Sequence, residues 1–190
     1  AESSQRVKGT IEGIEAIYAP DVWLSTKTGI EEYGRKWVAM HKETCEATRV
    51  HGTQSTDLLD LRMSCLDANL FELQALVDEL GTASADSANE PGVSMYAAQA
   101  AVSLTPVSRC SRAGLLRRGR LILPAGSEAE AIALQAQLSA ARVAGTLGDS
   151  ASALIAAEEV HRKAQELGLV NLATQASLVL AKQEHRLGQL

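Results

Sequence analysis

One histidine and one cysteine near residue 40 are of types that bind transition metals or act in nucleophilic catalysis. His41 and Cys45 lie four positions apart, so on a helix they share one face. A zinc site needs further ligands, and the nearest, His51, would have to fold back from a following loop. One helix face also does not aim the imidazole nitrogen at the thiol, as a nucleophile requires. We therefore predict no metal, no cofactor and no catalytic residue here.

Motifs that would mark an enzyme are missing from the whole sequence. No GxGxxG or GxxxxGK[ST] stretch is present to hold a phosphate. The His-Arg-Asp and Asp-Phe-Gly motifs of a protein kinase are also absent. We predict that this chain is not an enzyme.

The composition favours an all-α protein. Apolar residues make up 46% of the 190 residues and aromatic residues only 3%, with four prolines. Abundant Ala and Leu, with few aromatic residues, favour helices. The formal charge of −5 gives no overall attraction for nucleic acid, and the apolar runs are too short for a membrane span. Arg109, Arg112, Arg117, Arg118 and Arg120 form a local basic run, either an anion contact or, as we prefer, a solvated connector.

Apolar spacing predicts a helix over 3–18 and then a long antiparallel hairpin over 21–81. The break between them is at Ala19-Pro20-Asp21. Trp23, Tyr33 and Trp37 follow the apolar stripe of the hairpin's first helix, and we interpret them as core residues in preference to an aromatic cage. Residues 81–92 predict a loop, 93–104 a shorter helix and 121–126 a linker.

The last part of the sequence repeats with a period of 40 residues. The first copy contains Ala133, Gln135, Ala136, Leu138, Ala141, Leu147 and Gly148, and the second contains Ala173, Gln175, Ala176, Leu178, Ala181, Leu187 and Gly188. Each copy predicts a helix, a Leu-Gly turn and a second helix, as in tetratricopeptide hairpins. We predict a helical bundle over 1–126 and one full and one truncated repeat over 127–190. Such hairpins stack into a right-handed α-solenoid, and further repeats are expected to follow.

Three cysteines leave two interpretations open. Cys45, Cys65 and Cys110 lack the Cys-x-x-Cys spacing of zinc sites. They are either buried thiols that pack as small apolar groups, or one disulfide with an odd cysteine whose partner lies outside this chain.

The stretch from Trp37 to Leu66 resembles a known family. It resembles the region that follows the kinase domain in bacterial serine/threonine protein kinases with tetratricopeptide repeats. The matching residues are Trp37, Met40, Cys45, Glu46, Ala47, Thr48, Gly52, Gln54, Ser55, Leu58 to Met63, Cys65 and Leu66. Residues 104–110 are similar to the family's Leu-Pro-Pro-Leu-x-x-Cys, whereas residues 84–92 and the basic run depart from its pattern.

The resemblance implies a non-catalytic regulatory or sensor region of a kinase that binds a partner protein or peptide on a helical-repeat surface. Alternatives are a small-molecule sensor, with its pocket between the hairpin and the first repeat, and a spacer that self-associates. Family members commonly place a membrane span between kinase and repeats, which implies a location outside the cytoplasm. There Cys45, Cys65 and Cys110 would be disulfide candidates, with a fourth cysteine upstream of Ala1.

Overall fold

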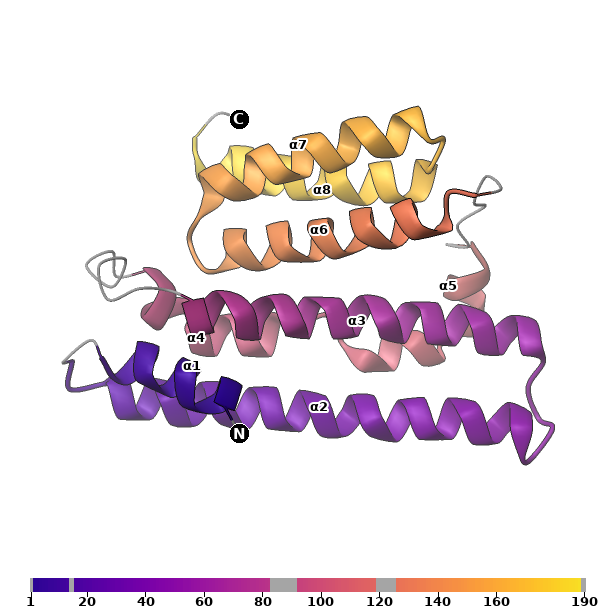
Figure 1. Cartoon of the computed structure of the whole chain (residues 1–190), viewed down its shortest axis with the longest axis horizontal. Helices are drawn as coiled ribbons and strands as arrows, with labels where there is room; N and C mark the ends of the chain where they lie inside the picture. Colours follow the sequence, from indigo (N-terminus) through magenta and orange to yellow (C-terminus); the bar gives the residue numbers. More distant parts are fainter. Residues whose placement is uncertain (1, 14–15, 83–91, 119–125, 189–190) are drawn as a thin grey trace.

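The computed structural model describes residues 2–13, 16–82, 92–118 and 126–188 (Figure 1). All regular secondary structure in these ranges is helical, which confirms the predicted all-α class. Most of the predicted loop over 81–92 and most of the predicted linker over 121–126 lie outside the described residues, as does Arg120. None of the described helices is both long and apolar enough to cross a membrane.

The helices follow one another with short connections. Their bounds are α1 Glu2–Glu12, α2 Ala19–Arg49, α3 Thr56–Thr82, α4 Gly92–Ser103, the 3₁₀ helix η2 Val107–Ser111, α5 Ala113–Arg118, α6 Glu128–Thr146, α7 Ser150–Glu166 and α8 Val170–Arg186.

The long hairpin is formed by α2 and α3. Helix α2 begins at Ala19, so the expected start at Asp21 is two residues late, and Pro20 lies in the first turn, where its missing N–H leaves no bond unmade. Gly52, with φ of 60°, turns the chain between the helices. Helix α3 then begins beside Ser55, whose hydroxyl accepts a hydrogen bond of 3.3 Å from the amide of Leu58.

The prediction of one helix over 3–18 is wrong. Helix α1 ends at Glu12, directly before Gly13, a residue type that loses much backbone freedom in a helix. Val7 and Ile11 are buried as their spacing indicated. Tyr18 is 48% exposed and is the residue before α2, so it does not belong to the face of α1.

The helices are arranged in successive layers (Figure 1). Helices α1 and α2 lie along one side of α3, and α6 lies along the other, followed by α7 and α8. Two core clusters result. The first combines residues of α1–α4 and η2 with Val143 of α6 and Leu147, which directly follows α6. The second joins α6, α7 and α8. Helix α6 thus packs in both directions, and the domain boundary at 126/127 stays a prediction.

Glycine turns join the last three helices at the predicted positions. Gly148 and Gly168 have φ of 106° and 69°, values that favour glycine after a helix end. Gly188, the repeat counterpart of Gly148, has φ of 70°. The side chain of Asp149 caps α7 by accepting from the amide of Ser152 at 3.0 Å.

Candidate functional site

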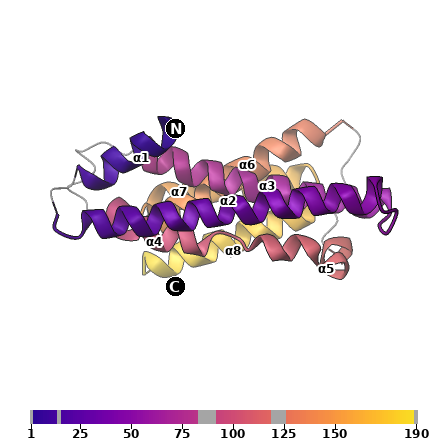
Figure 2. The same ribbon diagram turned by 90° about the horizontal axis from the view of Figure 1, so that it is seen from below.

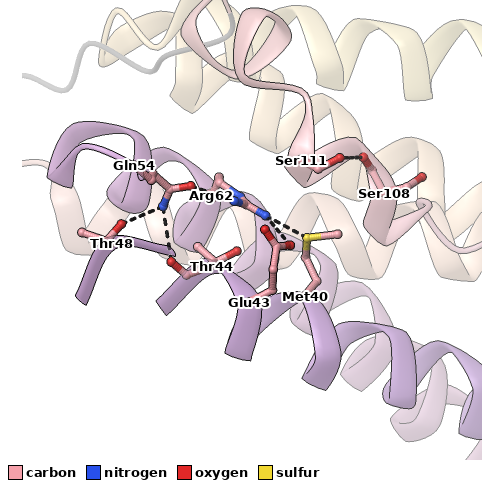
Figure 3. Close-up of polar contacts among 8 residues, drawn as sticks. All are labelled: Met40, Glu43, Thr44, Thr48, Gln54, Arg62, Ser108 and Ser111. Atoms are coloured by element: carbon pink, nitrogen blue, oxygen red, sulfur yellow. Dashed lines mark hydrogen bonds and ion pairs between the residues drawn. The ribbon is translucent and has the colours of Figure 1, made fainter. Parts of the chain in front are cut away.

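A buried polar cluster surrounds Arg62 where α2 and α3 meet their connecting loop (Figure 3). The guanidinium of Arg62 donates to Oε1 of Gln54 at 2.7 Å, to Oε2 of Glu43 at 2.8 Å and to the sulfur of Met40 at 3.1 Å. Gln54 in turn donates to the hydroxyl of Thr48 at 2.9 Å. The cluster ties the loop to both helices.

The energetics of the Arg62 cluster favour a structural role. The side chain of Arg62 is 8% exposed, whereas that of Glu43 is 58% exposed and reaches solvent. A buried guanidinium requires partners for its N–H groups, and Gln54 and Glu43 supply acceptors for Nη1 and Nη2. Among the described residues, Nε of Arg62 and Oγ1 of Thr44 are buried without a partner.

The aromatic stripe lies against the core and does not form an open cage. Nε1 of Trp37 donates to the carbonyl of Leu66 at 2.7 Å, and His41 stacks on the Trp37 ring with centroids 4.9 Å apart. Tyr33 is buried, and Trp23 is half-buried against the same core cluster. The imidazole considered as a metal ligand is therefore a stacking partner of an indole.

A second polar cluster holds the backbone of Thr105, between α4 and η2. The Tyr33 hydroxyl donates to its carbonyl at 2.9 Å, and Nδ2 of Asn69 donates to the same oxygen at 3.2 Å. The backbone amide of Thr105 donates to Oε2 of Glu72 at 3.1 Å. Burial raises the pKa of Tyr33, and the charge of Glu72 raises it further. Asn69 and Glu72 were not singled out from the sequence. Their polar side chains on the apolar stripe of α3 could have indicated a buried polar cluster.

The cysteine candidates divide into a pair and a single residue. Cys65 of α3 and Cys110 of η2 form a disulfide, with their Cα atoms 5.6 Å apart. Cys110 is fully buried, whereas Cys45 is a half-buried free cysteine on α2. Together with the contacts of Thr105, this bond fixes η2 against the hairpin.

Arg142 of α6 connects the bundle to the last helix. Its Nη2 donates to Oε1 of Gln175 on α8 at 2.9 Å. Burial lowers the pKa of Arg142, the negative charge of Glu72 raises it, and the positive charge of Arg109 lowers it. The guanidinium of Arg142 on α6 is therefore affected by charges on α3 and η2, and it donates to a side chain of α8.

Groups with the chemistry of metal binding or catalysis do not gather in one place. No three His, Cys, Asp or Glu side chains lie close enough together to hold a metal ion within the ranges that the structure describes. Nδ1 of His161 lies 3.1 Å from the hydroxyl of Ser177 and 3.0 Å from the carbonyl of Ala173. Ser177 also donates to that carbonyl, which is the usual local bond of a helical serine.

A depression of about 330 Å³ lies where α3 begins beside α5. Its described lining residues are Ser55, Asp57, Leu58, Leu61 and Arg117. None of them comes from α6, α7 or α8, so this depression differs in place from the small-molecule pocket expected between the hairpin and the first repeat.

The two repeat copies differ in what covers them. Leu138 of α6 is fully buried in the cluster shared with α7, whereas its counterpart Leu178 of α8 is 69% exposed. Ala141 is buried, and its counterpart Ala181 is exposed. Val170, one turn before Thr174 and two before Leu178, is 72% exposed. Helix α8 thus presents a partly apolar face of Val170, Thr174, Leu178 and Ala181, here called the α8 face.

Comparison of the chain with protein-family models, curated proteins and solved structures finds no match.

Proposed function

We propose that this chain is a non-catalytic interaction region whose helical hairpins bind a partner protein or peptide. The hairpins α6–α8 are taken as tetratricopeptide-like repeats of a right-handed solenoid, and the whole as the regulatory part of a bacterial serine/threonine protein kinase. The resemblance over Trp37 to Leu66 supports the kinase assignment, and the 40-residue repeat supports the solenoid.

The α8 face is the observation that carries the proposal. In α6, the counterparts of Thr174, Leu178 and Ala181 belong to the core cluster shared with α7, whereas the counterpart of Val170 is the exposed Glu130. On α8 those positions are open, with Leu178 69% exposed. The apolar residues recur every three or four positions, which is the pattern that an amphipathic partner helix covers. The repeat thus indicates a helix as the occupant of this face.

The chemistry of the occupant follows from α7, which covers the equivalent face of α6. Helix α7 buries Ala153, Ala157, Val160 and Ala164, small or medium residues spaced by three or four. Small side chains permit close approach between helices, and Leu178 would then fill the groove between them. Burial of apolar area contributes about 25 cal/mol per Å², so a single helix binds weakly and several repeats bind more tightly.

Binding of a peptide with the sequence of α7 tests the proposal. A labelled peptide of residues 150–166 should bind the chain, followed by fluorescence anisotropy. Leu178→Lys should weaken this binding at least tenfold because a charge enters the contact. Val102→Lys is the control, since Val102 is also 69% exposed but belongs to α4 and not to the α8 face. Equal binding by wild type and L178K, or no saturable binding by wild type, would count against the proposed function.

A further inference from the structure

The charges of this acidic chain are strongly segregated along the sequence. Residues 91–127 contain five arginines and no Asp, Glu or Lys. The other 153 residues carry 13 Lys or Arg and 23 Asp or Glu, a formal charge of −10. A stretch with charge +5 is therefore set into a strongly acidic remainder.

The structure exposes the described part of this stretch. Three of its arginines are exposed: Arg109 of η2, Arg112 directly before α5, and Arg117 of α5. None of the three makes an ion pair with a carboxylate among the described residues. Elsewhere some exposed cations pair, as Arg162 does with Glu159 and Glu166, whereas Arg35 and Arg49 do not. We call the segment 105–118 the basic connector.

The basic connector is held in place by contacts that leave its arginines outward. Its first residue, Thr105, is bound through both backbone groups by Tyr33, Asn69 and Glu72. Cys110 lies between Arg109 and Arg112 and is joined to α3 by the disulfide.

Helices α4 and α5 follow one another along the same side of α2, opposite α1 (Figure 2). Figure 3 shows Ser108 and Ser111 of η2, with the Ser111 hydroxyl donating to the Ser108 carbonyl at 2.8 Å. A fixed scaffold reduces the entropy lost on binding.

Charge repulsion already acts within the connector's surroundings. The positive charge of Arg109 disfavours the charged form of Arg142, which is largely buried. The negative charge of Glu72 acts on Arg142 in the opposite sense and has the larger effect. A carboxylate bound beside Arg109 would be attracted by its exposed guanidinium and would lessen its repulsion of Arg142.

The negative charge of the other 153 residues favours a short anionic ligand over a long one. A long polyanion such as nucleic acid, or an anionic membrane surface, would extend beyond the connector and meet a remainder of charge −10. A short acidic peptide segment can be confined to the connector. Arginine binds carboxylates through two parallel N–H bonds, and exposed Leu115, within the connector itself, offers an apolar contact.

We propose that the basic connector is a docking site for a short acidic segment of a partner protein, recognised by Arg109, Arg112 and Arg117. The proposal rests on the proposed interaction function and names the chemistry of one partner segment. It differs in place from the α8 face, so the two can be tested separately.

A defined acidic peptide provides the test. The probe is a labelled ten-residue peptide with six Asp or Glu and two Leu, and its isostere has Asn and Gln in place of the acids. The acidic peptide should bind at 50 mM salt and lose at least tenfold in affinity at 300 mM, because screening shortens the range of the attraction. The isostere should bind at least tenfold more weakly.

Matched charge reversals locate the site. Arg112→Glu with Arg117→Glu should weaken binding at least tenfold. Arg6→Glu with Lys8→Glu makes the same change of charge on α1, on the opposite side of α2, and should alter affinity less than twofold. Equal losses in both variants, or equal binding of the isostere, would overturn the proposal.

Two further measurements separate other occupants. Tighter binding of a 12-nucleotide single-stranded DNA than of the acidic peptide would make the connector a nucleic-acid surface. Concentration-dependent dimers abolished by R112E with R117E would make it an interface between two copies of this chain. Either result contradicts the proposal. The α7-sequence peptide, measured on the same samples, reports the α8 face independently, because only Leu178→Lys should affect it.

Discussion

Arg62 and Gln54 are joined by a hydrogen bond of 2.7 Å between the guanidinium Nη1 and the amide Oε1. Gln54 belongs to the loop between α2 and α3, and Arg62 lies two turns into α3. The amide of Gln54 also donates to the carbonyl of Thr44 at 3.3 Å, so one loop side chain joins both helices. The path of the loop is thus fixed by side chains as well as by the turn at Gly52.

Replacement of Arg62 should destabilise the hairpin. Arg62→Ala should lower the free energy of unfolding by about 2–4 kcal/mol, because it opens space and leaves the Gln54 oxygen unpaired. Gln54→Ala should cost about 1–2 kcal/mol, since the buried guanidinium then loses one acceptor. Urea unfolding followed by tryptophan fluorescence measures both. Arg49→Ala, at an exposed position, is the control and should change stability by less than about 0.5 kcal/mol. An Arg62 variant as stable as that control would show that the cluster contributes nothing.

Loss of the disulfide between Cys65 and Cys110 should also destabilise the chain. The bond closes a loop with a sequence separation of 45 residues, and such bonds contribute about 2–4 kcal/mol, chiefly by restricting the unfolded chain. Cys65→Ser and reduction of the wild type should therefore lower the urea midpoint similarly. Cys45→Ser keeps the bond and should remain sensitive to reductant. A wild type whose midpoint is unchanged by a reductant that fully reduces it would contradict this expectation.

The helices could be predicted from the sequence because apolar spacing is a property of neighbouring residues in the chain. The hairpin predicted over 21–81 is observed over 19–82. The ends differ because the first turn of a helix accepts Pro20 and the last turn accepts Gly81, although both residue types disfavour a helix interior. The polar clusters were not predictable in this way. Tyr33 and Thr105 are 72 residues apart, and nothing near either residue indicates that they meet.

Identical residue types in the two repeats also end in different surroundings. Leu138 and Leu178 occupy equivalent repeat positions, and the sequence gives them the same meaning. Only the stacking order of the helices explains why the first is buried and the second is 69% exposed. A repeat identifies which face packs, whereas the neighbours in space decide whether that face is covered.

These two leucines should therefore respond to the same substitution by very different amounts. Leu138→Ala should cost about 2–5 kcal/mol because it removes fully buried methyl groups and leaves a cavity. Leu178→Ala should change the free energy of unfolding by less than about 0.5 kcal/mol, since most of its side chain already meets water. Thermal and urea unfolding of the two variants give the comparison. Comparable losses in both would mean that the α8 face is covered in solution, for example by a second copy of the chain.

The buried hydroxyl of Tyr33 should make stability depend on alkaline pH. Burial raises the pKa of Tyr33 above its ordinary value near 10, so above pH 10 the unfolded chain releases a proton that the folded chain keeps. The unfolded state then binds fewer protons, and the free energy of unfolding falls with rising pH, by up to about 1.4 kcal/mol per unit for this group. Below pH 10 both states are protonated and the contribution of Tyr33 is constant.

Tyr33→Phe separates this titration from other alkaline effects. The variant should cost about 1 kcal/mol at neutral pH, because the hydrogen bond to the Thr105 carbonyl is lost while Asn69 still donates to it. Its stability should decline less steeply than that of the wild type between pH 10 and 11.5. Tyr96→Phe retains Tyr33 and should keep the wild-type slope. If Y33F and wild type decline in parallel over this range, Tyr33 does not keep its proton in the folded state as its burial requires.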